Sequence, residues 1–461
     1  MTTNENGALP TRQMEAIRLD NLLINFTTEF NRVLDTKTLR SSTAGFWRPA
    51  PAPDELPGYF PLGDLAVSGE TNINGLRVAA VVRESGSPSA DSTKGNALSR
   101  PDDFERVWTD AGSGATTDAS IWRPIPPAGY VALGMVCSND HVKPSLNAVR
   151  CVRADLVIAS HVGSFIWSDE GSGARQNFSA WNIEPPTAAA GEIYFAPGTF
   201  FGVQSHNKPA TPLAYALRMQ IPLEVTSAPT APVLYGYEAP SAVETGKMTQ
   251  AAKLPWFAVR DNMHPVEQLR TSPHYRLERT DEWVLVGHGR NTSDKARPIK
   301  WTAFRAQDTT RSKAFSLLTS IEIGSAWPSE SGNYVRAISF SAKLNQRFAH
   351  SETTLSSWWN TAPRDVIAMA AKNKAVAVYQ MQSTYELLRE DGTPATISIE
   401  YTDDESLHLS EFPSDENGNL PLSPPLTTDS TRGEDTPEQI SDINVTPQPM
   451  EQWPTSTDTV P

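Results

Sequence analysis

The stretch "FERVWTDAGSGATTDASIWRPIPP", Phe104–Pro127, decides the fold because the chain uses it more than once. It returns as "SFIWSDEGSGARQNFSAWNIEPP", Ser164–Pro186, with the same spacing of two tryptophans around an aspartate and Gly-Ser-Gly-Ala. A divergent form between Phe30 and Asp64 lacks the Gly-Ser-Gly, and its Asp35 is expected to correspond to Asp110. This recurrence predicts one supersecondary unit used three times. We call residues 30–64, 104–134 and 164–198 the first, second and third copy.

Each copy has the pattern of strand, turn, strand, proline corner and strand. Because one such unit exposes an apolar face, three copies predict a β-prism around a pseudo-threefold axis, and a β-sandwich is the alternative closure. We expect Trp47, Trp122 and Trp181 to fill the shared centre, since a large ring buries much apolar area. The glycines of the Gly-Ser-Gly motif are expected to supply positive φ angles at a tight turn.

The Gly-Ser-Gly tips are structural turns in one interpretation and binding loops in another. In the second interpretation, a carboxylate beside backbone amides at a loop tip hydrogen-bonds sugar hydroxyls or a lipid head group, or contributes to a Ca²⁺ site. The candidate ligand-binding residues are Asp110, Gly112, Ser113, Gly114, Asp169, Gly171, Ser172 and Gly173.

Three motifs together resemble the Vps62-related family: "GFWRPAPAPDELPGYFPLGDLAV", "VWTDAGSGA" and "VRCVRADLV". The resemblance covers residues 40–225. It implies a role in vacuolar or membrane protein sorting and no enzyme activity. One departure is Met135, which stands where the first copy has Asp64 after "LG".

Alternating apolar residues in the C-terminal half predict a hairpin between Phe315 and Phe348. Its strands are about 10 residues long, which is near the length that a membrane-spanning β-strand requires. An ordinary half-buried antiparallel hairpin has the same alternation. The pattern loosely resembles the stem regions of aerolysin-type pore-forming toxins. The membrane-insertion candidates are Phe315, Leu317, Ile321, Ile323, Ile338, Phe340, Leu344, Trp358 and Trp359.

Composition excludes several classes of function. A formal net charge of −14 leaves no basic footprint for nucleic acid. The sequence has no catalytic motif and no metal-ligand motif, so we expect no enzyme, cofactor or metal, and we interpret His264 and His274 as residues of a polar loop. Cys137 and Cys151 are expected to be buried thiols, with a disulfide as the alternative.

The chain has no apolar segment of the length that a spanning helix needs, and its N-terminus is polar. We therefore expect a soluble protein with peripheral membrane association, either cytoplasmic or released by a non-classical route. Helices are expected only at Gln13–Leu34 and Asp365–Ala375. The remaining short apolar runs, separated by proline and glycine, predict a mainly β chain.

Changes in composition predict four segments. Residues 1–228 form a binding and targeting domain, 229–252 a linker, and 253–413 an elongated β-rich domain that is a candidate for membrane insertion. Residues 414–461 are predicted to be a disordered tail, since they carry nine acidic residues and one basic residue.

Two functional hypotheses follow from this organisation. In the first, the prism docks to a glycan or membrane lipid, the chain forms a homo-oligomer on the membrane, and an amphipathic hairpin opens a pore. In the second, the chain is a non-perforating interaction module in membrane protein sorting.

Overall fold

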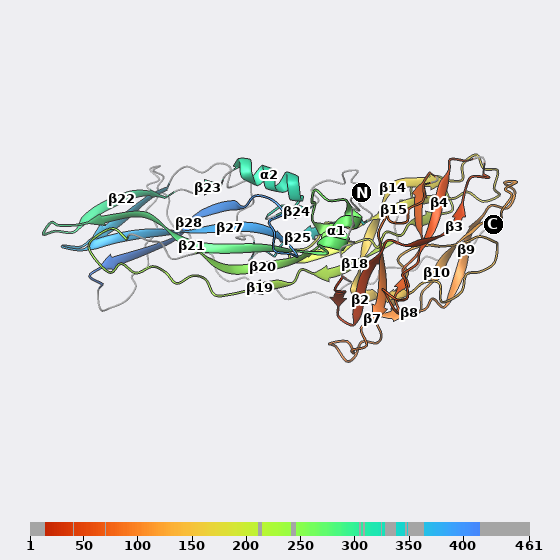
Figure 1. Ribbon diagram of the computed structural model, residues 1–461, viewed down its shortest axis with the longest axis horizontal. Helices are drawn as coiled ribbons and strands as arrows, with labels where there is room; N and C mark the ends of the chain where they lie inside the picture. Colours follow the sequence, from red (N-terminus) through yellow and green to blue (C-terminus); the bar gives the residue numbers. More distant parts are fainter. Residues whose placement is uncertain are drawn as a thin grey trace, which may run out of the picture. The chain divides into compact units, whose positions relative to one another are not determined.

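A computed structural model describes residues 14–414 except 40, 70, 211–213, 241–245, 304–305, 308, 324, 328–337, 346–347 and 349–363. These residues belong to one compact unit, Met1–Asp415. The predicted acidic tail lies outside the described residues from residue 415 onward. The described chain is mainly β, as the sequence predicts (Figure 1). The segment boundaries at residues 228 and 253 stay predictions.

Each copy, together with the strand that directly follows it, forms three adjacent antiparallel strands, and the second strand lies in the middle. In the first copy these are β3 (Phe30–Asp35), β4 (Ala44–Pro49) and β6 (Leu65–Ser68). The second copy has β9 (Asp103–Thr109), β10 (Ser120–Ile125) and β12 (Val136–Ser138). The third has β14 (Val157–Ser168), β15 (Ser179–Glu184) and β17 (Phe201–Val203).

One buried cluster takes side chains from all three of these strand groups. Its aromatic members are Phe46, Trp108, Trp167, Phe178 and Phe200. Trp167 packs edge to face against both Phe46 and Trp108. The predicted placement of Trp47, Trp122 and Trp181 in this centre is therefore wrong.

The alternation of side chains along a strand explains this correction. On β10, Ile121 enters the shared cluster, so its neighbour Trp122 faces the other side of the sheet and packs with Phe104. On β4, Phe46 and Trp47 divide in the same way.

Main-chain hydrogen bonds join the three copies in a ring. Asp64 N donates to Met135 O at 2.8 Å, Met135 N to Phe200 O at 3.4 Å, and Phe200 N to Asp64 O at 3.4 Å. The backbones approach closely there, because a Cβ on Gly134 would lie 2.5 Å from Thr199 Cβ. These bonds and the shared cluster tie the copies together, while a closed threefold prism stays a prediction.

Further strands form two small sheets or extend the sheet of the third copy. Two small sheets have the orders β1-β2-β7-β5 and β11-β13-β8. Strands β18, β16, β25 and β24 continue the sheet of the third copy. Their bounds are β1 Ile17–Leu19, β2 Leu22–Thr27, β5 Phe60–Pro61, β7 Ala79–Glu84, β8 Leu98–Ser99, β11 Tyr130–Val131, β13 Cys151–Arg153, β16 Glu192–Phe195, β18 Ala214–Gln220, β24 Ala326–Trp327 and β25 Phe340–Lys343.

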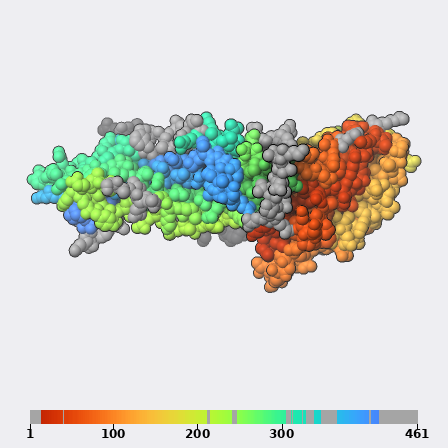
Figure 2. Space-filling model, in the orientation of Figure 1, coloured from red at the N-terminus to blue at the C-terminus, as the bar shows by residue number. Residues whose placement is uncertain are grey.

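The rest of the described chain is built on a six-stranded antiparallel sheet of order β19-β20-β21-β27-β28-β23. In Figure 2, green residues of this sheet border blue ones, so segments far apart in the sequence lie side by side. Strands β22 and β26 form a separate pair. The bounds are β19 Leu223–Val225, β20 Lys247–Pro255, β21 His274–Arg290, β22 Arg297–Ala303, β23 Ala306–Gln307, β26 Arg364–Ala370, β27 Ala375–Arg389 and β28 Ile399–Phe412.

Helices occur where the sequence analysis does not expect them. The described helices are α1 (Pro265–Thr271), α2 (Thr309–Thr319) and the 3₁₀ turns η1 (Ala154–Leu156) and η2 (Trp256–Ala258). The predicted helices at Gln13–Leu34 and Asp365–Ala375 are wrong, because strands occupy both segments. Among the described residues, no helix is long and apolar enough to cross a membrane. Cys137 and Cys151 are buried free thiols, as expected.

Candidate functional site

The two Gly-Ser-Gly tips have the same local structure. Gly112, Gly114, Gly171 and Gly173 all have positive φ, between 73° and 95°, which confirms the turn that the sequence predicts. In the second copy, Ser113 N donates to Asp110 O and Ser113 Oγ accepts from Ala115 N. The third copy repeats both bonds at Ser172. The serines therefore hold the turns in shape.

The two tips lie against each other. Arg175 N, just after the third-copy tip, donates to Ala111 O of the second copy at 3.0 Å. A Cβ added to Gly112 would lie 3.3 Å from Gly173 O. The structure thus brings the eight predicted ligand-binding residues together at two adjoining tips, at the ends of β9 and β14, where Asp110, Asp169 and Ser172 are buried.

The carboxylate of Asp169 is buried, and both of its oxygens accept hydrogen bonds from the protein. Its Oδ2 accepts from the indole Nε1 of Trp108 at 2.7 Å, and its Oδ1 accepts from Phe178 N at 2.7 Å. His206 Nε2 lies 2.8 Å from the same Oδ1. This side chain has a structural role, since it links the second copy to the third.

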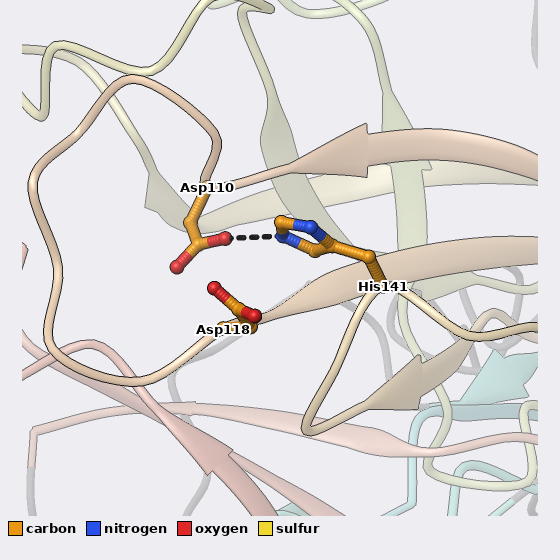
Figure 3. A group of neighbouring side chains, drawn as sticks. All are labelled: Asp110, Asp118 and His141. Carbon is orange, nitrogen blue, oxygen red and sulfur yellow. Dashed lines mark hydrogen bonds and ion pairs between the residues drawn. The ribbon is translucent and has the colours of Figure 1, made fainter.

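Asp110 has the same place in the second copy but different surroundings. The residue is 5% exposed, and His141 Nε2 lies 2.7 Å from its Oδ1. The exposed carboxylate of Asp118 faces the other side of Asp110 (Figure 3). The ligand atoms of Asp110, Asp118 and His141 all lie within 4.8 Å of one another.

In the first copy, the residue at the position of Asp110 is not Asp35, which the comparison of the repeated sequences predicts. Asp110 N donates to Ala119 O, and Thr36 N donates to Ala44 O in the same way. The counterpart of Asp110 is therefore Thr36, so the alignment with Asp35 is wrong by one residue. The first copy has no carboxylate at the equivalent position.

Sequence reasoning missed the two histidines beside the tips. His141 and His206 follow the third strand of their copies, far along the chain from Asp110 and Asp169. The available signal was that both copies place a histidine just after that strand. An Asp–His pair is thus repeated at the two tips, and only the second copy adds a further carboxylate.

The predicted membrane-insertion residues lie outside this site. Phe315 and Leu317 lie on α2, which corrects the strand expected there, and Phe340 lies on β25. Phe315, Ile321, Ile323, Ile338, Phe340 and Leu344 are buried, whereas Leu317 is exposed. Trp358 and Trp359 lie outside the described residues. Their role in insertion stays a prediction.

The comparisons with known proteins agree with the motifs of the N-terminal half. Residues 10–230 match the model of the family described as vacuolar protein sorting-associated protein 62, Vps62. The N-terminal half matches the Vps62 family. This match confirms the predicted resemblance and contains both Gly-Ser-Gly tips. No curated protein shows significant similarity to the chain.

Two solved structures are similar to parts of the chain. The crystal structure of GNIP1Aa from Chromobacterium piscinae is 26% identical, with a TM-score of 0.33. The match covers 41% of this chain and 34% of that one, so the chain spans about a third of GNIP1Aa. The crystal structure of Cry35Ab1 is 10% identical over 86% of this chain and 91% of that one, also with a TM-score of 0.33.

Proposed function

We propose that the protein binds membranes through the tips of its Vps62-type half and then opens a β-barrel pore as an oligomer. The tips would dock to a glycan or a lipid head group. An amphipathic hairpin built on β22 and β26 would enter the bilayer. The observation that carries the proposal is the two-faced construction of this strand pair.

The face of the β22–β26 pair that packs on the large sheet is apolar. In register, Trp301 pairs with Val366 and Ile299 with Ala368. Both pairs belong to clusters that include residues of β27 or β28. If the strands leave the sheet, this apolar face becomes available to lipid.

The outer face of the same pair is mixed, with exposed polar and apolar side chains. Lys300 forms a 2.6 Å ion pair with Asp365, and Thr302 pairs with Asp365 in the register. Ile367 and Met369 are exposed on this face. Lipid-facing and lumen-facing residues alternate in a membrane β-barrel, and a hairpin with one apolar and one mixed face approaches that pattern.

Two glycines on β21 leave room for the apolar face of the β22–β26 pair. A Cβ on Gly287 would lie 1.9 Å from a ring carbon of Trp301, and one on Gly289 would lie 2.8 Å from Ile299 Cδ1. The pair therefore packs on the sheet through side chains, and separate hydrogen bonds hold its own two strands together. Such a layer can detach without breaking the sheet beneath it.

The length of the hairpin also bears on the proposal. Strands β22 and β26 have seven residues each, whereas a membrane-spanning β-strand needs about 9–11. The connection between them, residues 304–363, contains every insertion candidate that the sequence predicts. We propose that this connection extends both strands when the hairpin inserts, which requires α2 to unfold.

Vesicles test the proposal. The full chain is added to liposomes that contain a self-quenched dye and, in a parallel set, brominated lipids that quench tryptophan. We expect dye release, oligomers on the membrane, and quenching that decreases in Trp301→Phe. Trp283→Phe is the matched control, because Trp283 lies on β21 of the underlying sheet and its loss should leave the quenching unchanged. A protein that binds vesicles without leakage or oligomers would overturn the pore.

The second candidate is a non-perforating interaction module in membrane protein sorting. It is favoured by the extent of the family match, which covers residues 10–230 and none of the β22–β26 pair. This function predicts vesicle binding that is retained when residues 297–370 cannot leave the sheet. The vesicle experiment separates the two candidates, because only the first predicts leakage.

A further inference from the structure

We propose that Asp110, Asp118 and His141 bind a divalent transition-metal ion of the Zn²⁺ class at the tip of the second copy. This inference goes beyond the proposed function. It also differs from the sequence expectation of no metal, because no short motif connects the three residues.

Three separate segments bring the ligands together. Asp110 directly follows β9, Asp118 lies just before β10, and His141 follows β12 (Figure 3). Their ligand atoms lie within 4.8 Å of one another. Zn²⁺ bonds of about 2.0–2.2 Å in a tetrahedron set the ligand atoms about 3.3 Å apart. Binding would therefore lengthen the 2.7 Å contact between Asp110 Oδ1 and His141 Nε2 and draw the exposed Asp118 side chain inward.

The state of the Asp110 carboxylate is an independent observation that points to a cation. The side chain is 95% buried, and among the described residues its only hydrogen-bonding partner is His141, on Oδ1. Its second oxygen points toward the carboxylate of Asp118 (Figure 3). Two carboxylates that face each other repel, and little water reaches the mostly buried Asp110 side chain to screen that repulsion. A cation between the two carboxylates relieves the repulsion.

The third copy provides an internal comparison. Asp169 has the same place in its copy, but Trp108 Nε1 and Phe178 N donate to its two oxygens. Asn177 stands where the second copy has Asp118, two residues before the serine that begins the next strand. The third copy therefore satisfies its buried carboxylate with protein donors, and the second copy leaves one oxygen for a ligand.

The donor set indicates the class of metal. One imidazole nitrogen with two carboxylates suits Zn²⁺ or its neighbours, whereas Ca²⁺ and Mg²⁺ prefer oxygen ligands alone. Three protein ligands leave at least one coordination position open. The ion would fix both ends of the 110–118 loop to the segment after β12, and the open position would accept an oxygen of a bound molecule.

Calorimetric titration of the chelator-treated full chain with Zn²⁺ tests the site. We expect one ion per chain for the wild type and affinity at least tenfold weaker for Asp118→Asn, a change at an exposed position that leaves the fold intact. His206→Gln should bind as the wild type does. Asn177→Asp should gain no second ion, because the oxygens of Asp169 already have donors.

Two results would overturn the inference. One is the absence of stoichiometric Zn²⁺ binding by the wild type, and the other is equal affinity in the wild type and Asp118→Asn, which would place the ion elsewhere. The titration uses no membrane. Its failure therefore leaves the pore proposal standing, and failure of the vesicle experiment leaves the metal site standing.

Discussion

The indole Nε1 of Trp108 donates a 2.7 Å hydrogen bond to Oδ2 of Asp169, and both side chains are buried. The bond connects the strand that opens the second copy with the tip of the third. Trp167 makes a similar bond across copies, from its Nε1 to Ser42 O at 2.6 Å. Two buried indoles thus hold the copies together through directional contacts as well as apolar packing.

Replacing Trp108 by Phe should cost more stability than the same change at Trp47. Both rings are buried, but Trp47 Nε1 has no hydrogen-bond partner among the described residues. Trp108→Phe leaves Asp169 Oδ2 without a donor, and a hydrogen bond to a charged group contributes about 1.5–3 kcal/mol. Urea denaturation should show Trp108→Phe less stable than Trp47→Phe by about 2 kcal/mol. Equal losses would contradict a role for the indole N–H.

A methyl group on Gly287 should disrupt the packing of the β22–β26 pair against β21. The new Cβ would overlap the ring of Trp301, and overpacking of this kind costs about 1–3 kcal/mol. Gly287→Ala should therefore lower the thermal unfolding midpoint, and the same change should lower it less in a Trp301→Ala background, where the ring is absent. Gly236→Ala is the control, because nothing lies within 4 Å of its Cβ position. An equal effect of Gly287→Ala in both backgrounds would show that the contact with Trp301 is not the cause.

The stability of the protein should decrease in mildly acidic solution because of His274. Burial, with a smaller effect of nearby Lys253, lowers the pKa of this imidazole from 6.5 to about 4. Between pH 6.5 and about 4, the unfolded chain therefore binds a proton at His274 that the folded chain does not bind. The stability that is present above pH 6.5 is lost as the pH falls toward 4.

Denaturation at pH 7.5 and at pH 4.5 measures this effect. The drop in the free energy of unfolding between the two should be smaller in His274→Gln than in the wild type. The pKa of Asp20 is lowered from 3.8 to about 2, chiefly by a hydrogen bond from Ser89, so its contribution is lost only below this window. The same drop in both proteins would assign the acid sensitivity to other groups.

The errors in the sequence analysis have physical causes. Strand β2 is buried on every residue from Leu22 to Thr27, so it lacks the alternation that distinguishes a strand from a buried helix. Strand β26 has two alanines and a methionine, which favour helices, but its pairing with β22 decides its structure. Tertiary pairing overrode local propensity in β26, and burial on both faces removed the periodic signal in β2.

The candidate site was predictable only in part. The turn at each tip follows from local glycine chemistry, so the positive φ of Gly112 and Gly171 was predicted correctly. His141 reaches Asp110 from 31 positions along the chain, and no local pattern encodes that approach. Ile121 and Trp122 are both apolar and both buried, so the sequence alone could not show which one faces the centre.

The ring of main-chain hydrogen bonds through Asp64, Met135 and Phe200 has a consequence for how the copies can differ. Backbone amides and carbonyls bond in the same way whichever side chain the residue carries, and an acid, a thioether and an aromatic ring occupy the three positions. This ring of main-chain bonds by itself therefore places few demands on side-chain identity, whereas Asp64 also accepts hydrogen bonds through its buried side chain from Arg48 and from Cys137 N. The residues at the tip of one copy can therefore change while the same main-chain ring holds that copy to the other two.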